Sequence, residues 1–228
     1  MVERVVAARA TGLSLSAAIE RVKRSTPLQN WSPFATLRRR QPELEPRLIS
    51  KRALIALSHA IEDEMLARAE RALIFGCFQR VRFYRQEQAR WLELTDAAPA
   101  AAVFADFDAA AAPLSAPAEI PIAPGDPLSR EWALVCYGER HAVCMSGREP
   151  ASSRADGLTA ERRFETVWTV ETDLVREVAR GCAQAAAELV PEVGERAAAS
   201  LLLRPISTPR EQAALATAII NRTLSYIS

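Results

Sequence analysis

The segment between Leu48 and Phe75 constrains the fold more than any other part of the chain, because it contains neither glycine nor proline. We expect a long helix from about Ser50 to about Ala69, followed by a short apolar strand that continues through Gly76. A helix turns about 100° per residue, so the apolar residues of this segment fall on two sides of it. One stripe contains Leu54, Leu57, Ile61 and Met65, and the roughly opposite side contains Ile55 and Leu66.

A helix that is apolar on two sides should be sandwiched between two neighbours. We therefore expect one face to cover a sheet and the other face to meet a second element, a partner or a ligand. His59, Glu62 and Asp63 lie between and beside the two apolar stripes.

The next segments predict a mixed α/β sheet. ALIFGCF (72–78) and AAVFADF (101–107) have the character of buried strands, and the helical segment 82–94 separates them. This spacing predicts a parallel βαβ unit. EIPI (119–122) follows, then an antiparallel hairpin of EWALVCY (131–137) and HAVCMSG (141–147) around Gly138, and then RRFETVWTV (162–170). We expect an α/β (α+β) fold with five or six strands.

Helical patterns occupy both ends of the chain. Two short helices are expected in 2–24 and a short helix from Ser32 and Pro33 to before Pro42. Three more are expected at the carboxyl end, and the last opens with Thr208, Pro209 and Glu211, the pattern of a capping box. Its apolar positions indicate either docking on the core or pairing with a second copy, and both alternatives stay open.

Composition excludes several classes of protein. The 228 residues are 49% hydrophobic, which is enough for a full core in one domain with helical extensions. The net charge is +1, so no basic field indicates a nucleic-acid surface. There is no apolar run long enough for a membrane span and no signal-peptide pattern, and we expect a cytoplasmic protein that does not engage a membrane.

The four cysteines predict no metal or redox site. They lack any CxxC spacing, and small buried apolar groups are the simplest interpretation. One alternative is that Cys136 and Cys144 approach each other across the expected hairpin. His59 and Asp63 lie one helical turn apart and could share a metal or a proton, but no third ligand has a defined spacing. The alternative is that Asp63 orients His59.

Several blocks in order resemble the DICT domain, a sensory module first described in diguanylate cyclases and two-component systems and also attached to MerR-like transcription regulators. The blocks are LISKRALIALSHAIEDE, LIFGCFQRVRFY, ARW and AVFADF, and the resemblance covers roughly residues 34–189. It implies a signal-sensing α/β domain. It implies no catalytic residue set and no settled ligand or cofactor.

A second, shorter resemblance concerns the amino-terminal residues. AARATGLSLSAAIERV resembles the trailing part of a MerR-type DNA-binding domain, in which a turn matching Gly12 to Leu15 precedes a helix. The resemblance implies that DNA is contacted only through a domain absent from this chain. We accordingly expect a helical remnant at 1–24, a sensory domain at 25–189 and a helical extension at 190–228.

The residues after the first parallel strand are the best ligand candidates. Gln79 and Arg80 follow that strand, and Asp106 follows the next one, so all three should share the edge of the sheet where open α/β sheets hold ligands. Arg80 suits an anion, and the aromatic rings of Tyr84 and Trp91 suit a planar ring. His59 would face this edge if the long helix borders it. The alternative is that the aromatic rings are core and the arginines are solvated.

No sequence motif supports catalysis, since there is no nucleophile elbow, phosphate loop or dinucleotide fingerprint. We therefore expect a non-enzymatic sensory domain, which binds a small molecule and forms a homodimer, as the effector part of a bacterial MerR-like regulator. The alternative is a protein-interaction or dimerisation scaffold without a ligand. The two hypotheses differ in whether a cavity lies near Gln79 and Asp106.

Overall fold

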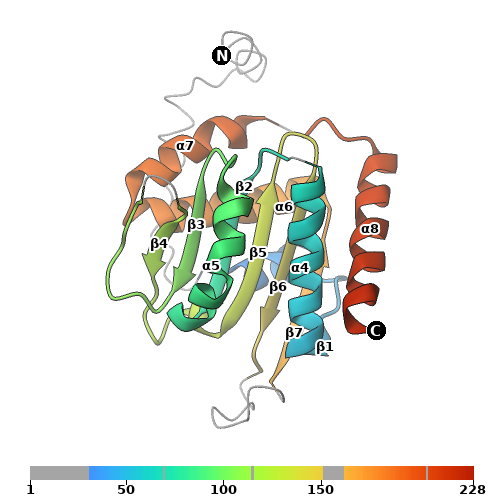
Figure 1. Ribbon diagram of the computed structural model, residues 1–228, viewed down its shortest axis with the longest axis horizontal. Helices are drawn as coiled ribbons and strands as arrows, with labels where there is room; N and C mark the ends of the chain where they lie inside the picture. Colours follow the sequence, from blue (N-terminus) through green and yellow to red (C-terminus); the bar gives the residue numbers. More distant parts are fainter. Residues whose placement is uncertain (1–30, 69, 114–115, 151–161, 204) are drawn as a thin grey trace.

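The computed structural model describes residues 31–68, 70–113, 116–150, 162–203 and 205–228. The helical remnant expected at 1–24 lies outside these residues. In the described part, helices cover both faces of one mixed sheet (Figure 1). This confirms the predicted fold class.

The sheet has seven strands in the order β1-β7-β6-β5-β2-β3-β4. Their bounds are β1 Arg47–Ser50, β2 Leu73–Gln79, β3 Ala101–Ala105, β4 Ala118–Pro121, β5 Glu131–Tyr137, β6 Ala142–Arg148 and β7 Arg163–Thr169. The pairs β2–β3 and β3–β4 are parallel, and the remaining pairs are antiparallel. The predicted βαβ unit and hairpin are therefore confirmed, whereas the expected number of five or six strands was too low. The additional strand is β1, which pairs with β7 at the edge of the sheet.

Three helices cover one face of the sheet. They are α4 Lys51–Ala67, α5 Val81–Thr95 and α8 Pro209–Ile227. The apolar stripe of α4 is buried as predicted, and Leu54 and Ile61 have no exposed surface. Ser50 caps α4 by accepting a hydrogen bond from the backbone N–H of Ala53. α4 also contacts both α5 and α8, and α8 lies beside it (Figure 1).

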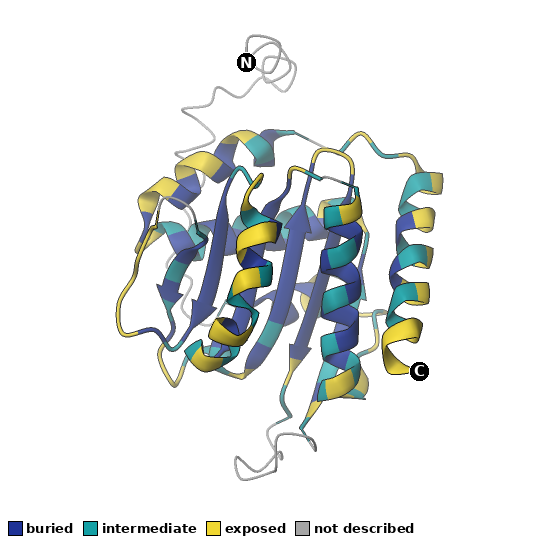
Figure 2. Ribbon diagram, viewed as in Figure 1, coloured by how far each residue is buried: buried dark blue, intermediate teal, exposed yellow. Residues whose placement is uncertain are grey.

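The opposite face of the sheet is covered by α3 Pro33–Arg40, α6 Thr172–Ala187 and, packed on α6, α7 Pro191–Leu202. A single-turn 3₁₀ helix, η1 Pro127–Arg130, precedes β5. Because strand side chains alternate between faces, Leu73, Phe75 and Cys77 of β2 point to the α6 side and Ile74 and Phe78 to the α4 side. The strands therefore form the buried centre between two helical layers (Figure 2).

The same alternation separates the two cysteines of the hairpin. Cys136 pairs with Val143 and Cys144 with Val135, so the cysteines occupy neighbouring positions of opposite orientation. Cys136 lies in the core under α4, and Cys144 lies in the core under α6. All four cysteines are free and buried, and burial raises the pKa of each thiol, which keeps it neutral.

The carboxyl-terminal helix docks on its own chain. Thr208 and Glu211 form the predicted capping box at its start. Leu215 and Ile219 are fully buried in the core that α4 and α5 share. α7 and α8, which the sequence assigns to a carboxyl-terminal extension, thus pack on α6 and α4. No helix in the described ranges is long and apolar enough to cross a membrane.

Candidate functional site

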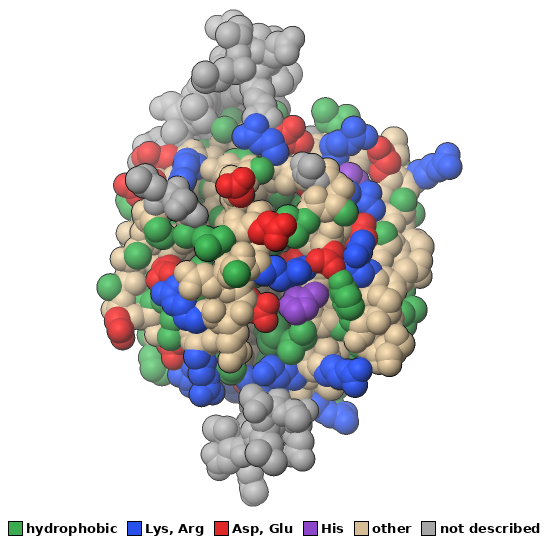
Figure 3. All heavy atoms as spheres, in the orientation of Figure 1, with side chains coloured by type: hydrophobic (Ala, Val, Ile, Leu, Met, Phe, Trp, Pro, Cys, Tyr) green, Lys and Arg blue, Asp and Glu red, His purple; other side chains and the backbone are tan. Residues whose placement is uncertain are grey.

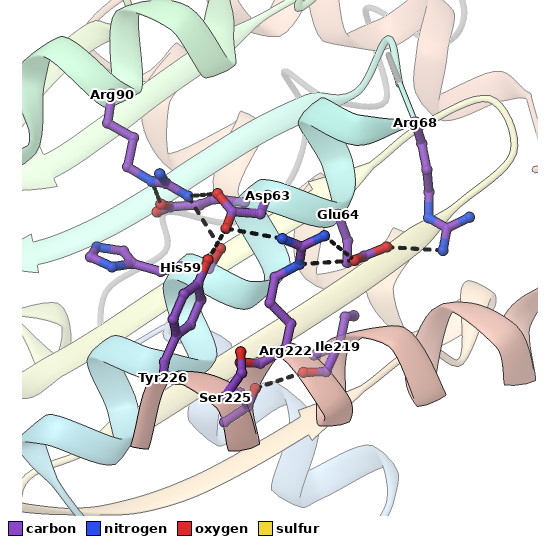
Figure 4. A network of polar contacts seen from close by, with 11 residues as sticks. His59, Asp63, Glu64, Arg68, Arg90, Ile219, Arg222, Ser225 and Tyr226 are labelled. Atoms are coloured by element: carbon purple, nitrogen blue, oxygen red, sulfur yellow. Dashed lines mark hydrogen bonds and ion pairs between the residues drawn. The ribbon is translucent and has the colours of Figure 1, made fainter. Parts of the chain in front are cut away.

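Helix α4 carries three consecutive acidic residues that join it to both neighbouring helices (Figure 4). Arg90 of α5 binds the carboxylates of Glu62 and Asp63 and donates to the carbonyl oxygen of His59 at 3.2 Å. The Glu62 side chain is only 5% exposed. Removal of one partner from a buried ion pair leaves the other charge uncompensated, so the pair of Arg90 and Glu62 holds α5 on α4 and would be costly to break.

Arg222 of α8 makes the corresponding contact from the other side. It binds Glu64 at 2.9 Å and approaches Asp63 at 3.6 Å, and Tyr226 donates its hydroxyl proton to Asp63. Arg68 binds the second oxygen of Glu64 at 3.0 Å. Asp63 is therefore shared between an arginine of α5 and two residues of α8, as Figure 4 shows.

The pKa values of the two carboxylates respond differently to this network. Burial raises the pKa of Glu62, and the hydrogen bond from Arg90 only partly opposes it. Burial also acts to raise the pKa of Asp63, but hydrogen bonds from Tyr226 and Arg90 outweigh it and lower the pKa below its ordinary value. Of the two carboxylates, Glu62 is thus the one that depends more on Arg90 to stay ionised.

The sequence-predicted site begins at the carboxyl end of β2. Gln79 is buried and has φ 63°, the left-handed region that residues other than glycine rarely adopt. The register of β2 against β3 shifts between Cys77 and Gln79. The side-chain oxygen of Gln79 accepts a hydrogen bond from Arg162 at 2.6 Å, and its amide nitrogen lies 3.5 Å from Glu149. These contacts join Gln79 to the residue that follows β6 and the residue that precedes β7.

Arg80 and Asp106 meet at the shared rim of β2 and β3, as the topology predicts. Arg80 Nη1 lies 3.1 Å from Asp106 Oδ2. The other oxygen of Asp106 accepts the backbone N–H of Val81 at 2.5 Å, in the first turn of α5. Asp106 thereby satisfies one of the free amide groups at the start of that helix, where a negative charge is stabilising.

Tyr84 and Trp91 lie on the inner side of α5. Both are essentially buried, and their rings form an aromatic cluster with Phe78 and Phe107. The Tyr84 hydroxyl and Trp91 Nε1 find no hydrogen-bond partner among the described residues. A buried polar group without a partner costs about 1–3 kcal/mol, so two such groups in one cluster require an explanation.

A small cavity of about 50 Å³ lies between α4, α5 and β5. We call it the α4–α5 cleft, and its wall includes His59, Glu62, Glu87, Trp91 and Trp132. His59 Nε2 lies 3.4 Å from Glu87 Oε2, and each side chain is about one third exposed. The cleft combines aromatic walls with a polar mouth, but its volume corresponds to little more than one water molecule.

The six predicted residues therefore fall into separate groups. His59 and Trp91 line the α4–α5 cleft, and Tyr84 lies behind Phe78 and Trp91. Arg80 and Asp106 bind each other at the rim, and Gln79 is bound to Arg162. Asp63 does not orient His59 through a side-chain contact, because Asp63 binds Arg90 and Tyr226 while His59 meets Glu87.

The face formed by α4 and α5 carries mixed charge. Basic and acidic side chains are interspersed over its middle, and basic side chains predominate along its lower edge in the space-filling view (Figure 3). Within the described ranges, no three metal-ligating side chains gather in a way that would hold an ion. Nothing in this arrangement selects a particular cofactor.

Sequence reasoning missed a second cavity, which is larger than the α4–α5 cleft. It has a volume of about 480 Å³ and lies between α8 and the edge of the sheet formed by β1 and β7. Ile49, Leu57, Trp168 and Leu224 are among its lining residues. Its walls come from a strand that the sequence did not predict and from a helix whose docking the sequence left open, so no local signal could have located it.

One family model matches the chain. It is the model of DICT, described as "Sensory domain in DIguanylate Cyclases and Two-component system", and it covers residues 32–150. The match begins at the residue that caps α3 and ends just after β6. No curated protein and no solved structure gives a significant match.

Proposed function

Because this chain belongs to the DICT family of sensory domains, we propose that it binds a small molecule next to α5 and passes the resulting change to α8. In this proposal the residues that meet the ligand are those selected from the sequence: His59, Gln79, Arg80, Tyr84, Trp91 and Asp106. The domain acts as the sensory part of a bacterial signalling protein and has no catalytic task.

The observation that carries the proposal is the pair of unpartnered polar atoms on α5. The Tyr84 hydroxyl and Trp91 Nε1 are buried inside an aromatic cluster, and Trp91 also forms part of the wall of the α4–α5 cleft. Tyr84 lies behind Phe78 and Trp91. A ligand that enters the cleft and displaces these two rings would supply an acceptor for both donors and a planar surface for the rings. The cleft must widen for this, because its volume of about 50 Å³ is too small for a ring system.

Widening of the cleft would also affect the position of α8. Arg90 follows the cleft residue Glu87 by one helical turn and binds Glu62 and Asp63 of α4. Asp63 in turn binds Arg222 and Tyr226 of α8. A displacement of α5 from α4 therefore changes the position of a carboxylate on which α8 depends, and this network provides the physical link between signal and output.

The finer parts of the proposal follow from the resemblance of the amino-terminal residues to the MerR type. We propose a cytoplasmic regulator that forms a homodimer and acts on DNA through a separate DNA-binding domain. In such an assembly a shift of α8 would alter the relation between the two protomers. Resemblance over sixteen residues supports this part of the proposal, and the family match supports the sensory role.

Native mass spectrometry of freshly purified protein, together with an absorption spectrum, tests the proposal. We expect an added mass that denaturation removes, or a rise in Tm with at least one of ATP, cyclic di-GMP and FMN. Tyr84→Phe should lose the added mass or the Tm shift and leave the unliganded protein no less stable, because the hydroxyl has no partner there. The proposal fails if no mass is added and none of the three compounds shifts Tm.

Tyr137→Phe is the matched control for this experiment. The Tyr137 hydroxyl is also buried, but it donates to the Leu203 carbonyl oxygen at 2.7 Å. Its removal should cost about 1 kcal/mol of stability and leave ligand binding unchanged. A Tyr84→Phe protein that behaves like Tyr137→Phe in both measurements would contradict the assigned role of Tyr84.

The second candidate function is a ligand-free interaction scaffold. It is favoured by one observation: of the eight large apolar side chains exposed in the described ranges, four belong to α8, namely Ile220, Leu224, Tyr226 and Ile227. Such a concentration is typical of a surface that meets a partner. Sedimentation that shows a dimer, combined with an absence of bound small molecule, would favour this function over the sensory one.

A further inference from the structure

The cavity at the edge of the sheet has three walls. We call it the α8 groove: α8 supplies Ile220, Thr223 and Leu224, α4 supplies Ala53 and Leu57, and the third wall comes from β1, β7 and the turn before β1. Its volume of about 480 Å³ falls within the range of about 300–1,000 Å³ that is typical of small-molecule sites. A hollow of this volume is large enough for a small organic molecule.

The interior of the α8 groove offers few polar partners. Its two buried or half-buried threonine hydroxyls already donate hydrogen bonds within the chain, Thr166 to the Phe164 carbonyl oxygen at 3.2 Å and Thr223 to the Ile219 carbonyl oxygen at 2.7 Å. Both hydroxyls can still accept a hydrogen bond. Most of the remaining wall is aliphatic or aromatic, with the indole of Trp168 on the sheet side.

The charged groups of the α8 groove lie at one end. Glu43, Glu45 and Arg47 belong to the turn before β1 and to its first residue. Arg47 and Glu45 form an ion pair at 3.1 Å, and both side chains are more than two thirds exposed. With Glu43, this end of the groove carries two carboxylates and one guanidinium, so it does not favour a carboxylate or phosphate.

The α8 wall of the groove is apolar and exposed to solvent. Ile220 is 47% exposed and Leu224 is 55% exposed, although both line a concave surface. Removal of apolar surface from water is favourable by about 25 cal/mol per Å². A molecule that fills the groove would cover these side chains together with Leu57 and Trp168, which gives an apolar occupant most of its binding free energy.

We propose that the α8 groove binds a neutral, largely apolar small molecule of drug-like size, with at most one or two hydrogen-bond donors. This site is separate from the α4–α5 cleft, and the inference does not depend on the proposed function. The occupant would bridge α8 to β7 and α4. Only Leu215 and Ile219 of α8 are fully buried, so such a bridge would add substantially to the attachment of the second half of the helix.

The neutral fluorophore N-phenyl-1-naphthylamine is a suitable probe, because it is apolar and fits the volume of the groove. We expect a saturable rise in its fluorescence with the purified full chain at micromolar to tens of micromolar concentration. Ile220→Gln combined with Leu224→Gln should weaken binding at least tenfold, and both positions are exposed enough to keep the fold. Hydrogen exchange of α8 amides after Ile219 should slow when the probe is bound to the unmodified protein.

Leu48→Gln combined with Leu189→Gln is the matched control, since both leucines are about as exposed as Leu224 but do not line the groove. The control should bind the probe with unchanged affinity. Tyr84→Phe should also bind it normally, which separates this test from that of the proposed function. The inference is overturned if fluorescence does not saturate or if both double variants bind alike. It is also overturned if sedimentation shows a dimer that the groove variant dissociates while the probe binds neither form.

Discussion

The indole of Trp91 lies directly against Gly76, in the space that any side chain at position 76 would need. A β-carbon at Gly76 would be 2.3 Å from Trp91 Cη2 and 2.6 Å from Cζ2. Glycine in the middle of a strand is normally unfavourable, because it has no side chain to pack. Its place in β2 is explained by the close approach of α5, and Trp91 thereby fixes the distance between α5 and the sheet.

Gly76→Ala should therefore destabilise the protein. The new methyl group would displace Trp91 and strain the aromatic cluster, at a cost of about 1–3 kcal/mol. Urea unfolding followed by circular dichroism measures this cost. Gly125→Ala is the control, because a β-carbon there meets nothing within 4 Å. Equal stability of the two variants would show that α5 does not rest on β2 as described.

A second prediction concerns Glu131, the buried first residue of β5. Its side chain accepts a hydrogen bond from the backbone N–H of Phe34 at 3.1 Å and from the Ser146 hydroxyl at 3.3 Å, so it ties the start of α3 to the sheet. Burial raises its pKa from 4.5 to about 7, although hydrogen bonds from Ser32, Phe34 and Ser146 and the charge of Arg148 oppose the shift. The folded protein thus holds a proton here that the unfolded chain releases near pH 4.5.

The sign of the pH dependence follows from that difference. Between pH 4.5 and about 7 the folded state binds more protons at Glu131 than the unfolded state, so the contribution of Glu131 to stability falls as pH rises. The loss is complete above pH 7 and is on the order of 3 kcal/mol, since each pKa unit corresponds to 1.36 kcal/mol. Glu131→Gln keeps an acceptor for Phe34 and should remove this dependence.

Urea unfolding at pH 5, 6, 7 and 8 measures the effect. The difference in stability between Glu131→Gln and the unmodified protein should grow steadily from pH 5 to 7 and then stay constant. Glu45→Gln, at a side chain that is 69% exposed, should follow the unmodified protein at every pH. A Glu131→Gln profile parallel to that of the unmodified protein would mean that Glu131 titrates at its ordinary pKa.

A third prediction concerns the separate contributions of Arg90 and Glu62 to stability. Arg90→Met leaves the Glu62 carboxylate buried without its cation and should cost about 3–5 kcal/mol. Glu62→Gln in the same protein removes that uncompensated charge, so the double variant should be more stable than Arg90→Met alone. Denaturant unfolding of both single variants and the double variant gives the coupling energy. Additive costs would contradict a direct interaction between the two side chains.

Local signals in the sequence predicted most elements correctly, because each signal acts within a few residues. Ser50 begins α4 as expected, and Thr208 with Glu211 begins α8. Strand β1 was missed for the opposite reason. It has four residues, none of them buried, and Leu48 is 52% exposed. Its pairing with β7 depends on residues more than a hundred positions away in the chain, which no local pattern records.

In the candidate site, too, some features follow from the sequence and others depend on distant parts of the chain. The shared location of Arg80 and Asp106 follows from parallel strands that end at one edge of the sheet. Their ion pair at that edge is an observation of the structure that the sequence did not predict. The left-handed backbone of Gln79 does not follow, because glutamine has no preference for it and the conformation depends on a register shift against β3. Prediction of the α8 groove would have required the position of α8 relative to β1, and these two elements lie far apart in the sequence.

The last prediction concerns the attachment of α8. Arg222→Gln removes the contacts with Glu64 and Asp63 but leaves Glu64 its ion pair with Arg68, so the global cost should be about 1 kcal/mol or less. The local effect should be larger, because the helix beyond Ile219 has no fully buried side chain. Amides in its last two turns should exchange several-fold faster in hydrogen-exchange mass spectrometry, while those of α4 stay protected. Arg210→Gln, at an exposed arginine in the first turn of the same helix, should leave this exchange unchanged. Faster exchange in both variants would indicate fraying of α8 as a whole, and exchange unaffected by Arg222→Gln would show that the acidic residues of α4 do not hold the helix.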